Sequence, residues 1–196
     1  MAAASDRGVA LADIVVATAL VALVSATTIP VVAGALESER TRVGAQYLAV
    51  VLQQTQLDAL RRGTFVALRI SAGQRDTVWQ AFADGNGNGV LARDIEDGID
   101  LALGPPDHLG VHAREVSLRL NQAVPDMGGG GMLTAGADPL RIGRSDLLSF
   151  SPTGSATAGT MYVSAPRGPQ IAIRITGPTG RIRVLRFDTG ASAWLP

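Results

Sequence analysis

The 196-residue chain contains no cysteine and no lysine, and only 4% of its residues are aromatic. Without cysteine it cannot form a disulfide or bind a metal through thiolate ligands. Without lysine it cannot complete a phosphate-binding P-loop or form a Schiff base with a carbonyl substrate. Its basic residues, all arginine, equal its acidic residues at 17 each, so the whole chain has no net charge that attracts polyanions or anionic lipids. Any nucleic-acid site must therefore be local.

The sequence also offers little for catalysis. The two histidines, His108 and His112, are four residues apart, a spacing that makes a metal pair only within a helix. Gly104 and the two prolines that follow it argue against a helix at this point. No serine stands in the spacing of a nucleophile elbow. We therefore expect a protein that is not an enzyme.

Charged residues are absent from residues 14–36, a run of 23 residues that reads IVVATALVALVSATTIPVVAGAL. A helix of this length crosses the roughly 30 Å hydrocarbon layer of a membrane. The alternative is a secretory signal peptide, but the apolar region of such a peptide spans only about 7 to 15 residues. The run therefore predicts a membrane-spanning helix.

The helical pattern continues beyond this apolar run. Apolar residues recur at intervals of three, four and seven over residues 36–60, and polar residues fill most of the other positions. Gly63 follows Arg61 and Arg62, which is typical of a helix end. Arginine interacts favourably with the negative end of the helix dipole, and glycine adopts the left-handed conformation of the cap without strain.

The predicted helix thus runs from about Val9 to Arg62 and has two halves. Residues 9–36 are apolar on every side, whereas residues 37–63 have an apolar and a polar face. The second half therefore needs a domain to pack against. Pro30 has no amide hydrogen to donate, so it should kink the first half.

The segment RGVALADIVVATALVALVSATTIP resembles the class III signal and first helix of type IV pilins and type II secretion pseudopilins. In that family a prepilin peptidase cuts after a glycine, here Gly8, and the new N-terminal residue, here Val9, is usually methylated. The resemblance implies that residues 1–8 are a leader peptide. It also places Pro30 at the twenty-second position of the mature chain, where the family commonly has proline.

Asp13 is the fifth residue after the implied cleavage site. The family has a glutamate there, which neutralises the N-terminal amine of a neighbouring subunit during assembly. This role is physically reasonable, because an ionisable group in an apolar span is costly unless it has a partner. The alternative interpretation is that Asp13 lies at the edge of the membrane.

Residues 64–196 are predicted to form a β-rich domain, so the predicted fold class is α+β, with a long helix packed on antiparallel sheets. Seven segments alternate or run apolar, and Gly, Pro, Asp or Asn separate them. The turn composition of residues 177–180 predicts a hairpin that keeps Ile171, Ile173 and Ile175 on one face and Arg174 on the other. The seven segments are residues 64–71, 76–82, 114–120, 146–152, 160–165, 170–177 and 181–188.

The C-terminal portion resembles the GspH/FimT group of pilin-like proteins, which includes minor pseudopilins. The resemblance implies a pilin-like fold and a subunit of a type II secretion pseudopilus or a type IV pilus, serving protein secretion or pilus assembly. Its partners would be the prepilin peptidase and other pilins or pseudopilins. It would cross the bacterial inner membrane once, with its C-terminal domain outside the cytoplasm, and be part of a filament when assembled. The residues that carry the resemblance are Gly159, Thr160, Tyr162, Gly177, Thr179, Gly180, Arg181, Arg183, Arg186 and Trp194.

The stretch DGNGNGVLARDIEDGID matches the first half of a calcium loop. Asp84, Asn86, Asn88 and Gly89 stand at positions one, three, five and six, where oxygen ligands alternate and glycine permits the turn. The usual glutamate at position twelve is missing, so a nearby acid such as Asp94 would have to close the site. The alternative is a turn between strands that binds no metal.

Arg181 and Arg183 are two residues apart in a predicted strand, so both project from one face. Two such cations side by side suit phosphate groups. In some FimT-like proteins a Gly-Arg-x-Arg stretch is associated with DNA capture, so the resemblance implies a DNA-binding minor pilin for DNA uptake as an alternative function. The arginines could instead lie on a solvated edge strand or form intersubunit salt bridges. A further alternative is a membrane-tethered ligand-binding domain that never assembles.

Overall fold

The computed structural model describes residues 5–73, 76–143 and 145–196; the side chains of residues 5–10, 27, 29 and 30 are not described. Gly8 and Val9 of the implied cleavage site and Pro30 of the predicted kink therefore lie outside the described side chains. The chain divides into two units, Met1–Leu36 and Glu37–Pro196, and each is described by itself.

The first unit belongs to helix α1 (Ser5–Arg62), which begins four residues before the predicted Val9. From Leu11 to Leu36 its large apolar side chains are between 50% and 70% exposed. This part of α1 is long and apolar enough to cross a membrane, and none of its most apolar stretch is buried among the residues that the structure describes. The predicted apolar helix is confirmed in length and composition.

The helix ends where the sequence predicts. Gly63 follows Arg62 with a φ angle of 67°, in the left-handed region, and its N–H group donates to the Ala59 carbonyl oxygen over 3.0 Å. Arg61 and Arg62 lie in the last turn, at the negative end of the helix dipole. The glycine cap directs the chain from the helix into the first strand.

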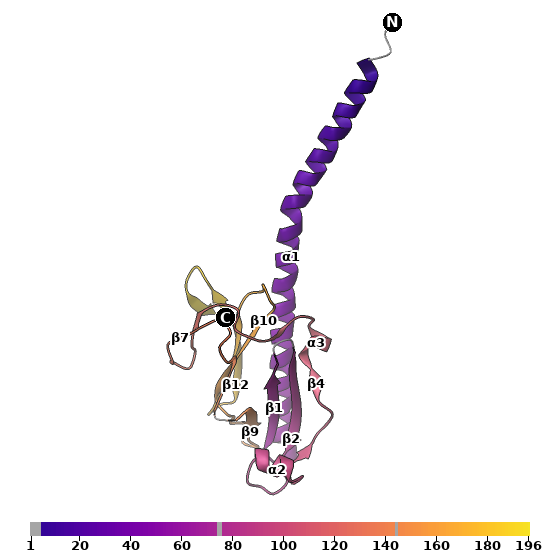
Figure 1. The fold of residues 1–196 in the computed structure, drawn as a ribbon. Coiled ribbons are helices and arrows are strands. Elements are labelled where there is room, and N and C mark those ends of the chain that lie inside the picture. Colours follow the sequence, from indigo (N-terminus) through magenta and orange to yellow (C-terminus); the bar gives the residue numbers. More distant parts are fainter. Residues whose placement is uncertain (1–4, 74–75, 144) are drawn as a thin grey trace. The chain divides into compact units, whose positions relative to one another are not determined.

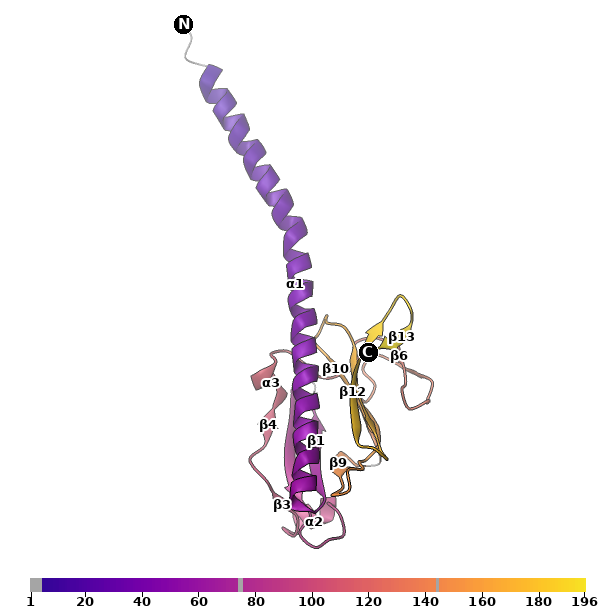
Figure 2. The same ribbon diagram turned by 180° about the vertical axis from the view of Figure 1, so that it is seen from behind.

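The second unit combines the second half of α1 with antiparallel sheets, which confirms the α+β class (Figures 1 and 2). Sheet A has the strand order β3-β2-β1-β9, with β4 also paired to β2. Sheet B has the order β13-β12-β11-β10-β5, with β8 also paired to β10, and β6 and β7 form a separate small sheet. The strands are β1 (Val66–Ala72), β2 (Thr77–Ala83), β3 (Leu101–Ala102), β4 (Asp107–His108), β5 (Ser117–Leu118), β6 (Val124–Pro125), β7 (Met132–Leu133), β8 (Leu140–Ile142), β9 (Leu147–Phe150), β10 (Gly159–Ser164), β11 (Ile171–Thr176), β12 (Arg181–Asp188) and β13 (Ala193–Leu195).

All seven predicted strands are present, although the segment 114–120 contributes only Ser117–Leu118. The hairpin β11–β12 has the predicted arrangement. Ile171, Ile173 and Ile175 are buried in the main core, and Arg174 is on the other face. Within the described residues, the other strands are three residues long or shorter, and the short helices α2 (Ala92–Glu96) and α3 (Leu109–His112) were not predicted.

The second half of α1 packs against the inner faces of both sheets. Leu48 and Leu52 of α1 share one core cluster with Leu68 of β1 and Ile173 of β11. Complete burial of each such side chain stabilises the fold by about 1.5 to 3 kcal/mol. Gly44 allows α1 to approach Val116 closely, because a Cβ atom at position 44 would be 2.8 Å from a methyl group of Val116. The second half of α1 thus packs against a domain, as its apolar face predicts.

Two smaller clusters lie on the outer faces of the sheets. On sheet A, Phe82 and Ala67 pack with Val90, which follows β2. On sheet B, Tyr162 and Phe187 pack with residues of the β6–β7 hairpin. The first cluster anchors the loop that carries the predicted calcium ligands, and the second anchors the β6–β7 segment on sheet B.

Candidate functional sites

The acidic loop, residues 84–100, begins directly after β2. The Asp84 carboxylate accepts three backbone N–H groups, from Asn86 at 3.0 Å, Gly87 at 2.7 Å and Gly89 at 2.8 Å. Gly87 and Gly89 have positive φ angles of 83° and 89°, so glycine is required for this tight turn. The carboxylate thereby organises the glycine-rich turn that the sequence shows.

Asp100 closes the other end of the loop and was not identified from the sequence. Its two carboxylate oxygens accept the N–H groups of Gly85 at 3.0 Å and Leu91 at 2.9 Å. Gly85 is needed at this point, because a Cβ atom there would overlap the carbonyl oxygen of Ile99. The acid-rich composition of the segment was the only sequence signal for this role.

Asp94 brings three of the four predicted calcium ligands together. One of its oxygens accepts the side-chain N–H groups of Asn88 at 2.9 Å and Asn86 at 3.0 Å. These hydrogen bonds lower the pKa of the Asp94 carboxyl group below its ordinary value, against the opposing effect of burial. The fourth predicted ligand, Asp84, is bonded to backbone N–H groups.

The loop therefore holds its shape through bonds between carboxylates and N–H groups. In the part of the chain that the structure describes, no group of three or more His, Asp or Glu residues is placed to hold a metal ion. A calcium ion would require Asn86 and Asn88 to turn their side-chain oxygens toward Asp94, because oxygen atoms are the ligands that calcium takes. The calcium site and the turn that binds no metal are both still untested, and the observed hydrogen bonds favour the turn.

The arginine face is formed by Arg174, Arg181 and Arg183 on strands β11 and β12. Arg181 and Arg183 are exposed and two residues apart on β12, and Arg183 lies directly opposite Arg174 on β11. Arg186 falls on the other face of β12, because side chains alternate along a strand. The structure thus brings together three of the four arginines of this hairpin.

The row of cations continues onto β8. Arg174 lies opposite Thr160 of β10, and Thr160 lies opposite Arg141. Sequence reasoning did not find Arg141, because only the strand register places it in this row. Like charges directly opposite each other destabilise a strand pair. The row is therefore an unfavourable arrangement unless anionic groups compensate it.

The partners of these arginines differ along the row. Arg141 lies 3.6 Å from the buried carboxylate of Asp126, and Arg174 donates to the carbonyl oxygen of Met127. A cavity of about 610 Å³ adjoins both arginines. Arg181 and Arg183 form no hydrogen bond or ion pair with any residue that the structure describes. Their charges are free to interact with an external group.

Asp126 is held in place by the aromatic cluster on sheet B. The Tyr162 hydroxyl group donates to Asp126 over 3.2 Å and accepts the Met127 N–H group at 3.0 Å. Burial raises the pKa of the Tyr162 hydroxyl group. The tyrosine therefore stays neutral and positions the carboxylate near Arg141.

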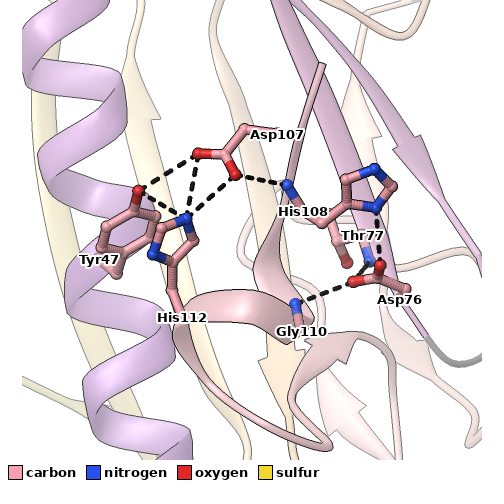
Figure 3. Close-up of polar contacts among 7 residues, drawn as sticks. All are labelled: Tyr47, Asp76, Thr77, Asp107, His108, Gly110 and His112. Atoms are coloured by element: carbon pink, nitrogen blue, oxygen red, sulfur yellow. Dashed lines mark hydrogen bonds and ion pairs between the residues drawn. The ribbon is translucent and has the colours of Figure 1, made fainter. Parts of the chain in front are cut away.

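The two histidines each form a pair with a different aspartate (Figure 3). Nδ1 of His108 lies 2.9 Å from Asp76, whereas Nε2 of His112 lies 3.0 Å and 3.1 Å from the two oxygens of Asp107. The expectation that this segment is not helical was wrong for one turn, because Leu109–His112 forms α3. The helical turn does not create a two-histidine metal site, since the rings bind separate carboxylates.

Asp13 lies on α1 with its side chain exposed. It forms no hydrogen bond or ion pair within the described ranges. Its proposed partner, the N-terminal amine of a neighbouring subunit, would come from another chain. In comparisons with known proteins, no family model matches this chain, and neither a curated protein nor a solved structure matches it.

Proposed function

We propose that the protein is a membrane-anchored, pilin-like subunit that a prepilin peptidase cuts after Gly8. It then assembles with other pilins or pseudopilins into a type II secretion pseudopilus or a type IV pilus. The observation that carries this proposal is the difference between the two parts of α1. Its first part exposes large apolar side chains over residues 11–36, and its second part is built into an α+β domain. The protein acts by assembly, not by catalysis.

A second feature of α1 supports assembly through helices. Within the domain, Val43, Val50 and Leu57 are spaced by seven residues, and their side chains are 42% to 47% exposed. A spacing of seven keeps side chains on one stripe of a helix and is the repeat through which helices pack in coiled coils. Leu60 adds a fourth exposed apolar side chain near the helix end. Helices of neighbouring subunits would cover this stripe.

The proposed location follows from the same helix. Residues 9–36 hold the precursor in the bacterial inner membrane as a single span, and the C-terminal domain lies outside the cytoplasm. Asp13 then neutralises the N-terminal amine that cleavage creates on a neighbouring subunit. An exposed carboxylate without a partner among the described residues suits this role, because a charge in an apolar environment requires an opposite charge.

The N-terminal mass of the protein tests the proposal. We would express the full chain in a host with a prepilin peptidase, recover it from membranes and measure its mass beside the Gly8→Ala variant. We expect a mature chain that begins at methylated Val9, and an uncut chain for Gly8→Ala. Gly34→Ala is the matched control, because a Cβ atom at Gly34 would contact nothing within 4 Å. It should be cut normally.

An uncut wild-type chain would contradict the proposal. The first helix would then be an anchor only, and the protein would be a membrane-tethered domain that binds a ligand without assembling.

A second candidate function is DNA capture by a minor pilin during DNA uptake. The observation that favours it is the exposed pair Arg181 and Arg183, which has no partner within the described residues and faces Arg174 across the hairpin. DNA binding through this pair should weaken as salt increases, since phosphate contacts release counterions. The Arg181→Ala, Arg183→Ala double variant should bind less, whereas Arg186→Ala, on the other face of β12, should bind normally. Absence of binding at low salt would exclude this function.

A further inference from the structure

The outer face of sheet B carries a cavity of about 610 Å³. Its walls include Arg141 of β8, Thr160 of β10 and Arg174 of β11, together with residues of the loop that joins β6 to β7. Four glycines line it without side chains that could fill it, and Gly130 has to stay small because a Cβ atom there would be 2.7 Å from the Asp126 carboxylate. The volume is in the range of small-molecule sites in proteins, about 300 to 1,000 Å³.

Three polar side chains of this wall stand in a row across the strands. Thr160 lies directly opposite Arg174 on one side and directly opposite Arg141 on the other. Residues that are directly opposite in an antiparallel pair project from the same face, with their Cβ atoms about 4.5 to 5.5 Å apart. This face is turned away from the core, because Ile173 and Ile175, the strand neighbours of Arg174, are buried in the core. Two guanidinium groups therefore flank one hydroxyl group in the wall of the cavity.

The Thr160 hydroxyl group has no partner in the part of the chain that the structure describes. Thr160 is only 3% exposed and lines the cavity. Among the described residues, the polar side-chain atoms that are both enclosed and unpaired belong to Ser117 and Asn121, so the Thr160 hydroxyl group reaches the open space of the cavity. Polar groups of buried residues nearly always have a hydrogen-bond partner. A molecule in the cavity has to supply the partner of this one.

The two arginines have hydrogen-bond donors to spare. A guanidinium group carries five N–H donors in a planar fork. Arg174 uses one of its nitrogens in a described bond, to the carbonyl oxygen of Met127. Arg141 is 46% exposed and lies 3.6 Å from Asp126, which is longer than a hydrogen bond. Most of the N–H groups of both side chains are therefore available to a ligand.

The two acids that line the cavity already have partners. The buried Asp126 carboxylate accepts a hydroxyl group and a backbone N–H group, at 3.2 Å and 2.9 Å. Asp138 accepts a further backbone N–H group at 3.0 Å. Their two negative charges balance the two arginines of the cavity, but Arg181 and Arg183 add two positive charges on the same face of the sheet. The surroundings of the cavity therefore attract an anion.

We propose that this cavity binds the terminal phosphate group of a small molecule through Arg141, Thr160 and Arg174. A phosphate monoester carries a charge of about −1.5 to −2 and three acceptor oxygens. Two forked guanidinium groups and one hydroxyl group match these oxygens and this charge. A carboxylate has only two oxygens and a single charge, and a phosphodiester of a nucleic-acid backbone likewise has two free oxygens and a single charge. The monoester therefore fits this row of donors best.

Titration with inorganic phosphate tests the proposal. We would follow the backbone amide signals of the full chain by NMR in uncharged detergent micelles, at low salt and about pH 8, where phosphate is mainly dianionic. We expect the signals of Gly128, Thr160 and Arg174 to shift and to saturate with a Kd of about 1 mM, because a few charge-assisted hydrogen bonds hold the ion. The signal of Leu52 in the core should not shift. Glucose 6-phosphate, which keeps a terminal phosphate group, should bind at least as tightly.

Variants of the row identify the donors. Thr160→Val removes the hydroxyl group and keeps the shape of the side chain, so the Kd for phosphate should rise about tenfold. Arg174→Gln removes one guanidinium group and should weaken binding by about tenfold or more. Arg186→Gln is the matched control, because Arg186 is exposed and falls on the other face of β12, and it should bind phosphate normally. An unchanged signal of Leu52 would show that each variant is folded.

An oligonucleotide without terminal phosphates separates this site from DNA capture. The Arg181→Ala, Arg183→Ala double variant should bind inorganic phosphate within about threefold of the wild type, whatever its effect on DNA, because other described residues line the cavity. The oligonucleotide should not displace phosphate. Displacement, with weaker oligonucleotide binding in Thr160→Val, would assign the cavity to a nucleic-acid backbone and overturn the proposal.

Three further results would contradict a site for a terminal phosphate group. The first is the absence of any shift with phosphate up to about 20 mM, and the second is an unchanged Kd in folded Thr160→Val. The third is a ligand preference that does not fit, with acetate as tight as phosphate or glucose 6-phosphate weaker than the free ion.

Discussion

The acidic loop and the arginine face each contain several residues of like charge, but they differ in how exposed these charges are and in whether the protein itself provides their partners. In the loop, Asp94 and Asp100 are each 2% exposed, and N–H groups of the loop itself meet their carboxylates. On the arginine face, Arg181 and Arg183 are exposed and bond to no described residue. Buried charges need partners, whereas exposed charges are solvated by water. The acids therefore build the fold, and the arginines are available to an external partner.

Replacing Asp100 with alanine should give the largest effect. The change removes the acceptor of the Gly85 and Leu91 N–H groups, which belong to exposed residues. We expect the free energy of unfolding to fall by about 2 to 3 kcal/mol, because each hydrogen bond to a charged group contributes about 1.5 to 3 kcal/mol and water replaces part of the loss at the freed N–H groups. Denaturant unfolding of the full chain in micelles, followed by circular dichroism, measures it.

Asp97→Ala is the matched control in the same loop. Asp97 has an exposed side chain 3.7 Å from Arg93, and such a surface pair contributes about 0 to 1 kcal/mol. Equal destabilisation by Asp97→Ala and Asp100→Ala would show that the loop does not depend on the bonds of Asp100. The inference that the buried acids of the loop stabilise the fold, whereas the exposed arginines do not, would then be wrong.

The long helix and the β11–β12 hairpin were predictable because their signals are local. A charge-free run followed by a helical period specifies α1, and Arg62 before Gly63 marks its end. In the hairpin, isoleucines alternate with other residues, and a turn sequence separates the strands. Each signal lies within a short stretch of sequence, so no knowledge of distant contacts is needed.

The pair of His108 with Asp76, the contact of His112 with Tyr47 and the full arginine row could not be predicted, because they depend on contacts between distant residues. Asp76 meets His108 across 32 positions of the chain, and Tyr47 meets His112 across 65. Arg141 joins Arg174 only through the register of β8, β10 and β11. Strands of two or three residues, such as β3 and β4, are too short to show a period. Their position is set by tertiary contacts.

The double variant Arg181→Ala, Arg183→Ala should change folding stability much less than Asp100→Ala. Its side chains lose no described partner, and removing like charges near Arg174 relieves repulsion across the strand pair. We expect the free energy of unfolding to stay within about 0.5 kcal/mol of the wild type. Denaturant unfolding under the same conditions provides the measurement. A loss as large as that of Asp100→Ala would mean that these arginines are structural.

Calcium should have the smallest effect on the acidic loop. The carboxylates of Asp84 and Asp100 already accept backbone N–H groups, so the loop holds its shape without an ion. We expect no heat in calorimetry of the full chain with about 5 mM calcium and no shift in the unfolding midpoint. A site with a Kd of about 1 mM would instead stabilise the fold by about 1 kcal/mol at that concentration. Heat that disappears in Asp94→Asn, which keeps the size of the side chain but removes its charge, would show that the loop binds calcium through the carboxylate that Asn86 and Asn88 now contact.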